Sequence, residues 1–410
     1  MTTLEAMSQM DVWQAGSQEY DRSTAVLPDP EPRERRHLII SVDDHLVEPP
    51  DLFTKRLPKK YLDRAPRVVE EGGREYWLID GGLELNVGGN AAAGRSVDAP
   101  LGGESVRFDE MRRGAWDIHE RIRDMDINGI YASLGFPSMV FSFAGQRFMR
   151  MRDPGLGQLC VRAYNDWVID EWTAPYPERI IPSQVVWLLD AEIAAAEVHR
   201  NAERGFKAVN FTENPQKLGL PSIHTDYWDP LFAACEETQT VLNLHVGSSS
   251  QVTHPSTDAP VDTIAALFMV NSMVASVDWV YSGIAVRFPE LKIALSEGGI
   301  GWVPAVLDRL EYLFEFPRTA TWSDQSISPA DILRRNFWFA SFWDPSAFEH
   351  RHQIGIDHIM VEADYPHVDS TWPDTQAMID RELEGLPAED VRKITCENAA
   401  QLYRHPLPAA

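Results

Sequence analysis

The sequence has little cysteine, little positive charge and no long apolar run. Three cysteines are too few and too scattered for a disulfide framework or a sulfur-ligated metal site. No run of about 18 apolar residues occurs, and the N-terminus lacks an apolar core of signal-peptide length, so we expect a cytoplasmic protein without a membrane span. Lys and Arg number 37 against 62 Asp and Glu, a formal charge of −25, which disfavours nucleic acid and anionic membranes as partners.

Short apolar runs alternate with helix-sized segments through most of the 410 residues. The runs are apolar on both faces and rich in β-branched and aromatic residues, as buried parallel strands are. They lie at 38–43, 129–136, 180–186, 206–211, 241–245, 291–297, 336–342 and 358–364. Eight such strands with intervening helices predict an α/β fold, a (β/α)8 TIM barrel.

Three segments fall outside the regular pattern. Residues 1–36 are polar and aperiodic, which predicts an N-terminal arm ahead of a barrel at 37–403 and a tail at 404–410. About 85 residues separate the first two strands, and their alternating apolar residues and paired glycines predict hairpins. Such an insertion, at about 54–115, would lie on the catalytic face as a lid, or serve only as a decorative or dimer-forming excursion.

Side chains that can bind metals gather where the predicted strands end. In a parallel barrel these ends converge on one mouth, where the active site lies. The candidates are Asp43, His45 and Glu48 after the first strand, Glu213 and His224, both weaker, after the fourth, His245 on the fifth, Glu297 on the sixth, and Asp364 and His367 on the eighth. Burying such charges without a partner costs several kcal/mol each, which a divalent cation would offset. The alternative is a set of unrelated helix caps and salt bridges.

Four segments together resemble one known superfamily. They are DDHLVEP (43–49), HVGSSS (245–250), RFPELKIALSEGGIGWVP (287–304) and VEADYPHVDSTWP (361–373). With them the chain resembles the metal-dependent amidohydrolases, specifically the branch with aminocarboxymuconate-semialdehyde decarboxylase and the resorcylate-type decarboxylases. The resemblance implies a metal-bearing barrel. It places the first-strand ligand pair on Asp43 and His45, the fifth-strand ligand on His245, and a ligand that also transfers protons on Asp364.

Two acids depart from that pattern. Glu297 stands where the relatives commonly carry a catalytic histidine, and Glu48 has no counterpart in the resorcylate-type members. With the other four residues they make four carboxylates and two histidines, the ligand inventory of dinuclear iron and manganese sites. Each acid has a simpler interpretation: Glu48 caps a loop by hydrogen bonding, and Glu297 pairs with an arginine such as Arg309. His367 would orient or relay protons to the site, or pack on Trp372.

Three functions follow as hypotheses. In its carboxylate-rich set the chain resembles the superfamily's dinuclear nonheme iron monooxygenases. The first hypothesis is therefore a dinuclear nonheme iron, or Mn/Fe, monooxygenase acting on a small organic or natural-product intermediate, with Asp364, Glu297 and His367 as catalytic residues. The second is a mononuclear hydrolase or nonoxidative decarboxylase, with zinc or manganese as its metal. The third is a non-catalytic subunit with a homologous partner. We expect a homo-oligomer or such a pairing, and a small-molecule substrate in either enzymatic case.

Overall fold

The computed structural model describes residues 26–86, 88–96, 106–256, 258–317, 322 and 324–408. Most of the predicted N-terminal arm therefore lies outside the described residues. Its described part runs across the surface of the barrel, where the Arg33 amide donates to Ile127 O at 2.8 Å. The guanidinium of Arg33 pairs with Asp374 at 2.8 Å. No helix within the described residues is long and apolar enough to cross a membrane.

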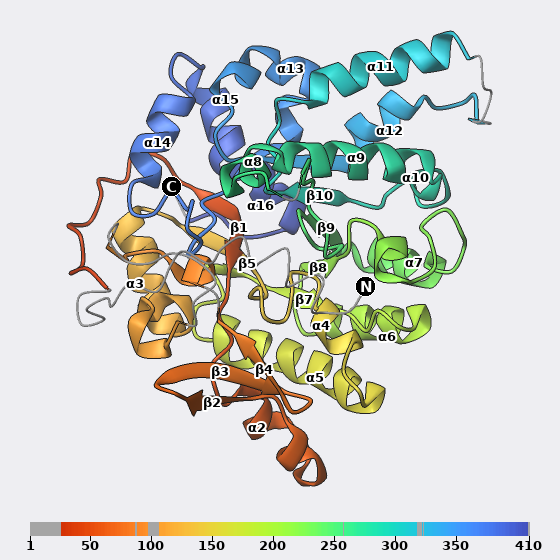
Figure 1. Cartoon of the computed structure of the whole chain (residues 1–410). Coiled ribbons are helices and arrows are strands. Elements are labelled where there is room, and N and C mark those ends of the chain that lie inside the picture. The colour runs from red at the N-terminus through yellow and green to blue at the C-terminus, as the bar shows by residue number, and fades with distance from the viewer. Residues whose placement is uncertain are drawn as a thin grey trace.

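Nine short parallel strands form the main sheet of the described chain (Figure 1). They are β1 (Ile40–His45), β5 (Ala132–Phe136), β6 (Ile180–Ile181), β7 (Ser183–Val185), β8 (Ala208–Phe211), β9 (Val241–His245), β10 (Ile293–Ser296), β11 (Phe337–Ser341) and β12 (Ile359–Val361). Their hydrogen-bonded order is β6-β5-β1-β12-β11-β10-β9-β8-β7. Only Pro182, which cannot donate to a ladder, separates β6 from β7. The order therefore begins and ends on one strand, and the sheet closes into the predicted (β/α)8 barrel.

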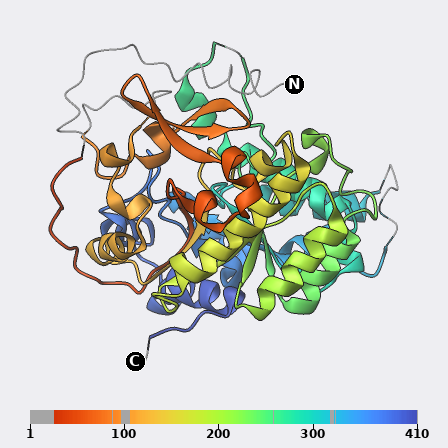
Figure 2. The ribbon, with the colours of Figure 1, turned by 90° about the horizontal axis from the view of Figure 1, so that it is seen from below.

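Helices surround this barrel on its outside (Figures 1 and 2). They are α2 (Leu52–Arg56), α3 (Ile118–Asn128), α4 (Gln146–Met149), α5 (Pro154–Trp167), α6 (Ala191–Glu203), α7 (Asp229–Thr238), α8 (Val261–Ala266), α9 (Phe268–Tyr281), α10 (Ile284–Arg287), α11 (Val303–Glu315), α12 (Pro329–Asn336), α13 (Arg351–Ile354), α14 (Thr375–Glu382), α15 (Ala388–Arg392) and α16 (Asn398–Tyr403). Because the helices cover the outer face of the barrel and side chains fill its inside, nearly every residue of the nine barrel strands is buried.

The insertion after β1 carries a separate antiparallel sheet, as the hairpin pattern predicts. Its strands are β2 (Arg67–Glu71), β3 (Arg74–Ile79) and β4 (Gly82–Leu85). Both turns have two residues with positive φ, Gly72–Gly73 and Asp80–Gly81, which matches the twist of a tight hairpin. The sheet lies to one side of the barrel, near α2 and α5 (Figure 1). Its function as a lid stays a prediction.

The ends of two strands differ from the sequence prediction. The eighth predicted strand runs to Asp364, but β12 ends at Val361 and Asp364 has a left-handed φ of 54°. The sixth predicted strand runs to Glu297, but β10 ends at Ser296 and Glu297 has a φ of 63°. A left-handed residue ends the strand conformation and turns the chain. Both acids thus lie just beyond their strands, on bends that redirect their side chains.

Candidate metal centre

Three strands bring four of the predicted ligands to the mouth of the barrel. Asp43 and His45 are two residues apart on β1, so their side chains point to the same face, into the barrel. His245 is the last residue of β9, and Asp364 follows β12, which pairs with β1 in parallel. The Asp364 amide donates to Asp43 O at 2.8 Å, which extends the contact between the two chain segments past the end of β12.

The ligand atoms of the other three residues gather around His45. His45 Nε2 lies 3.4 Å from Asp43 Oδ1, 3.1 Å from Asp364 Oδ1 and 3.2 Å from His245 Nε2. His245 Nε2 lies 3.3 Å from Asp43 Oδ2. Ligands about 2.1 Å from a shared cation are about 3.0–3.4 Å apart along the edges of an octahedron or tetrahedron. The separations among Asp43, His45 and His245 are therefore those of ligands arranged around a single divalent metal. Asp364 adds a carboxylate oxygen beside His45, in a neighbouring group with His367.

Several ligand atoms in this cluster lack hydrogen-bond donors, and a bound metal would take the place of those donors. Neither carboxylate oxygen of Asp43 has a hydrogen-bond partner among the described residues. Oδ1 of Asp364 meets the ring nitrogens of His45 and His367, at 3.1 and 3.0 Å. All four side chains are at most 2% exposed. His245 Nδ1 lies 2.6 Å from Val246 O, which places its proton there and leaves the Nε2 lone pair facing the cluster. Buried lone pairs without donors are costly, so this donor set fits a divalent cation.

The pKa values of the cluster are displaced in opposite directions. Burial, together with the negative charge of Asp364, raises the pKa of Asp43 well above its usual range. Burial and the neighbouring His367 lower the pKa of His45 well below its usual range. For Asp364 burial acts upward, but the charge of His367 and hydrogen bonds from His367 and His45 outweigh it, so its pKa lies below the usual range. Clusters of displaced carboxyl and imidazole groups of this kind are typical of functional sites.

His367 lies against this set. Its Nδ1 is 3.0 Å from Asp364 Oδ1, and its ring stacks on that of His45 with 3.6 Å between the centroids. Its Nε2 has no hydrogen-bond partner among the described residues. The predicted role of orienting Asp364 or exchanging a proton is compatible with this geometry.

Glu297 lies beside both His245 and Asp364. Its Oε2 is 3.6 Å from His245 Nδ1, the nitrogen that faces away from the four-ligand set. Ligand atoms of Glu297, Asp364 and Asp369 also lie within 4.8 Å of one another, which makes a second, acidic group. Burial raises the pKa of Glu297 well above its usual range, while His245 opposes that shift. The alternative pairing with Arg309 is not formed, since that guanidinium lies over the Tyr312 ring instead.

The structure does not bring the remaining candidates into the cluster. Glu48 is fully buried and its Oε1 accepts from Ser138 N at 3.1 Å, as the loop-capping interpretation expects. Burial raises its pKa to about 7. Its predicted ligand role has no geometric support here.

Glu213 and His224 also lie outside the cluster and bind other groups. Glu213 Oε2 accepts from Gly247 N at 3.0 Å, so it holds the turn that follows His245. His224 pairs at 2.8 Å with Asp278 and is half exposed.

Three residues of the site were missed in the sequence. Asp369 and Glu362 flank Asp364 in the segment VEADYPHVD, and proximity to that ligand was the signal that could have found them. Glu362 is 2% exposed and its Oε2 accepts from Glu297 N at 3.1 Å. Phe143 lies 4.2 Å from the His245 ring and 4.8 Å from the His45 ring, between centroids. It comes from a loop after β5, where no sequence pattern marks it.

Comparison with solved structures shows the same fold in several enzymes. An amidohydrolase from Mycobacterium avium subsp. paratuberculosis K-10 is 22% identical, with a TM-score of 0.69 over 90% of this chain and 99% of that chain. A 5-carboxyvanillate decarboxylase from Novosphingobium aromaticivorans DSM 12444, complexed with manganese and 4-hydroxy-3-methoxy-5-nitrobenzoic acid, is 19% identical, with a TM-score of 0.63 over 94% and 100%. A dihydroxybenzoic acid decarboxylase from Polaromonas sp. JS666, with bound manganese and 2-nitroresorcinol, is 18% identical, with a TM-score of 0.61 over 90% and 97%.

The sequence profile of the amidohydrolase family matches residues 54–405, which include His245, Glu297 and Asp364. Asp43 and His45 precede the matched range, so their assignment rests on the geometry of the mouth. The barrel and most of the sequence agree with the resemblance found in the four motifs, and the chain belongs to the amidohydrolase family.

Proposed function

We propose that this protein is a divalent-metal-dependent, nonoxidative decarboxylase that acts on a small aromatic carboxylic acid. Asp43, His45, His245 and Asp364 hold the metal. The observation that carries the proposal is the gathering of these four side chains at the mouth of the barrel, where His45 Nε2 lies 3.1 to 3.4 Å from ligand atoms of the other three. Two carboxylates with two imidazoles suit manganese, the metal bound in both similar decarboxylases.

The bound metal would supply Lewis acidity, polarising oxygen atoms of the substrate. The protein's own part is to position the substrate and to handle one proton. In the reaction the bond between the carboxyl carbon and its neighbour breaks, and the electron pair stays on the neighbouring carbon. That carbon takes up a proton and carbon dioxide leaves. Asp364 is placed to pass this proton on together with His367, because its Oδ2 is hydrogen-bonded to His367 Nδ1 at 3.2 Å.

His367 contacts the Asp364 carboxylate with one ring nitrogen and leaves its other ring nitrogen available. Its Nε2 has no partner among the described residues, so it is free to exchange a proton with substrate or water. Phe143 packs against the His45 and His245 rings and gives the metal centre an apolar wall. Such a wall excludes water from the carbanion-like carbon and suits a flat aromatic substrate.

The monooxygenase hypothesis receives no support from the comparisons, because the similar structures named above with a stated activity are decarboxylases. One observation still favours a second ion: the acidic group of Glu297, Asp364 and Asp369. Metal analysis separates the cases. One equivalent per chain supports a mononuclear centre, whereas two equivalents that fall to one in Asp369→Asn support a dinuclear centre.

The reaction is tested on manganese-loaded protein with hydroxybenzoates such as 2,6-dihydroxybenzoate and 5-carboxyvanillate. We expect release of carbon dioxide at equal rates with and without oxygen, and loss of turnover in Asp364→Asn. Asp374→Asn, the same change at an exposed salt bridge, is the matched control. A product that forms only with oxygen restores the monooxygenase hypothesis. Absence of bound metal after reconstitution favours the non-catalytic subunit.

A further inference from the structure

Asp364 holds its position at a conformational cost. Its φ of 54° lies in the left-handed region, which costs a non-glycine residue about 1 kcal/mol or more. The regular pairing between β1 and β12 ends before it, at the register pair Ser41–Val361. The Asp364 backbone is held on both sides, since its amide donates to Asp43 O and its carbonyl accepts from His367 N at 2.9 Å. The next residue along the chain, Tyr365, adds contacts to the outer side of β1.

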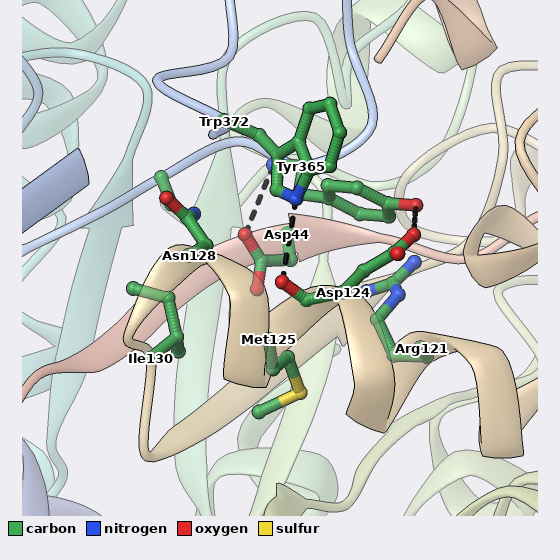
Figure 3. A pocket seen from close by; sticks show the side chains of 9 residues that line it. Asp44, Arg121, Asp124, Met125, Asn128, Ile130, Tyr365 and Trp372 are labelled. Atoms are coloured by element: carbon green, nitrogen blue, oxygen red, sulfur yellow. Dashed lines mark hydrogen bonds between the residues drawn. The ribbon is translucent and has the colours of Figure 1, made fainter. Parts of the chain in front are cut away.

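Every polar group of Tyr365 is engaged. Its amide donates to Asp44 Oδ1 at 3.0 Å (Figure 3). Its carbonyl accepts from His45 N at 2.7 Å. Its hydroxyl donates to Asp124 Oδ2 at 2.5 Å. The ring lies 4.4 Å from the Arg121 guanidinium carbon, in cation–π contact.

The partners of Tyr365 are themselves fixed. Asp44 lies between Asp43 and His45 but points to the opposite side of β1, where it also accepts from Ser41 Oγ at 3.1 Å. Arg112 binds both oxygens of Asp124 at 2.6 and 2.8 Å. Arg121, which is 1% exposed, donates to the carbonyl of His45.

These residues leave almost no free space. Asp44, Arg121, Asp124 and Tyr365 line a cavity of only about 10 Å³, room for a single water. A Cβ on Gly114 would lie 2.2 Å from Asp124 Oδ2 and 2.7 Å from the Tyr365 hydroxyl. The network is therefore closely packed as well as hydrogen-bonded.

We propose that Tyr365 is a positioning residue for the metal centre, and that Asp44 and Asp124 hold it in place. The three residues form a brace between the chain segments that carry His45 and Asp364. The brace fixes the strained backbone of Asp364 so that its carboxylate faces His45 rather than swinging away. The inference rests on the proposed metal site but not on the reaction catalysed there.

The test is the manganese dissociation constant of Tyr365→Phe, measured by titration of the metal-free full chain. This variant keeps the ring over Arg121 and removes only the hydroxyl, and Asp124 keeps both bonds from Arg112. Loss of such an outer contact typically weakens metal binding about 10–100-fold, and we expect a loss of at least about tenfold. Tyr131→Phe is the matched control, since Tyr131 is also a buried tyrosine and its hydroxyl donates to Pro406 O at 3.1 Å.

A pair of variants at Asp44 separates positioning from stability. Asp44→Asn keeps an oxygen for the Tyr365 amide and can donate to Ser133, but it removes a negative charge near the buried Arg121. It should lower the melting temperature and keep the manganese affinity. Asp44→Ala removes the oxygen and should lower both.

Two failures are distinguishable. If the wild-type chain binds no manganese, the proposed metal site fails. If it binds manganese and Tyr365→Phe binds equally well, the metal site stands and the brace is refuted. Equal affinities of Asp44→Asn and Asp44→Ala would also refute it.

Discussion

Two buried groups of charged and polar residues lie back to back across β1. On the inner side, Asp43 and His45 face the mouth, and neither oxygen of Asp43 has a hydrogen-bond partner among the described residues. On the outer side, Asp44 and Asp124 are bonded to hydroxyls, an amide and a guanidinium. Buried polar groups are normally satisfied, so the outer group is built to hold structure. The inner group is left incomplete, as a binding site is.

The largest effect that separates the two groups is expected at Asp43→Asn. Removing a metal ligand should weaken manganese binding at least about 100-fold and abolish turnover. The metal-free variant should be no less stable than the metal-free wild type, because burial already disfavours the charged form of Asp43. Dialysis against graded manganese, followed by thermal melts, measures both. A large loss of stability without metal would place Asp43 with the structural group.

The opposite outcome is expected at Arg112→Ala. Arg112 and Asp124 form a pair whose side chains are 7% and 3% exposed, so removing one partner leaves a buried charge and should cost about 3–5 kcal/mol. Urea unfolding of the metal-free chain measures this. Arg287→Ala breaks a more exposed pair with Asp229 and should cost at most about 1 kcal/mol. Similar losses in both variants would contradict the assignment of the outer group.

The smallest effect is a pH dependence at Glu48. Burial raises its pKa from 4.5 to about 7, so the folded chain binds the extra proton that the unfolded chain has lost. Stability therefore falls as pH rises from about 4.5 to about 7. Glu48→Gln should reduce that fall by up to about 3 kcal/mol while leaving metal stoichiometry unchanged. Loss of a metal equivalent in this variant would return Glu48 to the ligand set.

The fold was predictable because parallel barrel strands are apolar on both faces, and each of the eight predicted runs overlaps an observed strand. The pairs Asp43–His45 and Asp364–His367 were predictable too, since the ends of such strands meet at one mouth. The exact ends of the strands were not predictable. Nothing in the run 358–364 signals that β12 stops at Val361 and that the backbone of Asp364 is left-handed.

The sequence by itself determined the barrel and the side chains that its strand ends present. Those follow from hydrophobic periodicity and from the alternation of side chains, which are local properties. Only the tertiary structure decided which acids meet. Glu48 lies as close in sequence to His45 as His367 does to Asp364, yet Glu48 turns to Ser138 while His367 stacks on His45. Such choices depend on loops brought together across the barrel, such as the one that carries Phe143, and no local pattern encodes them.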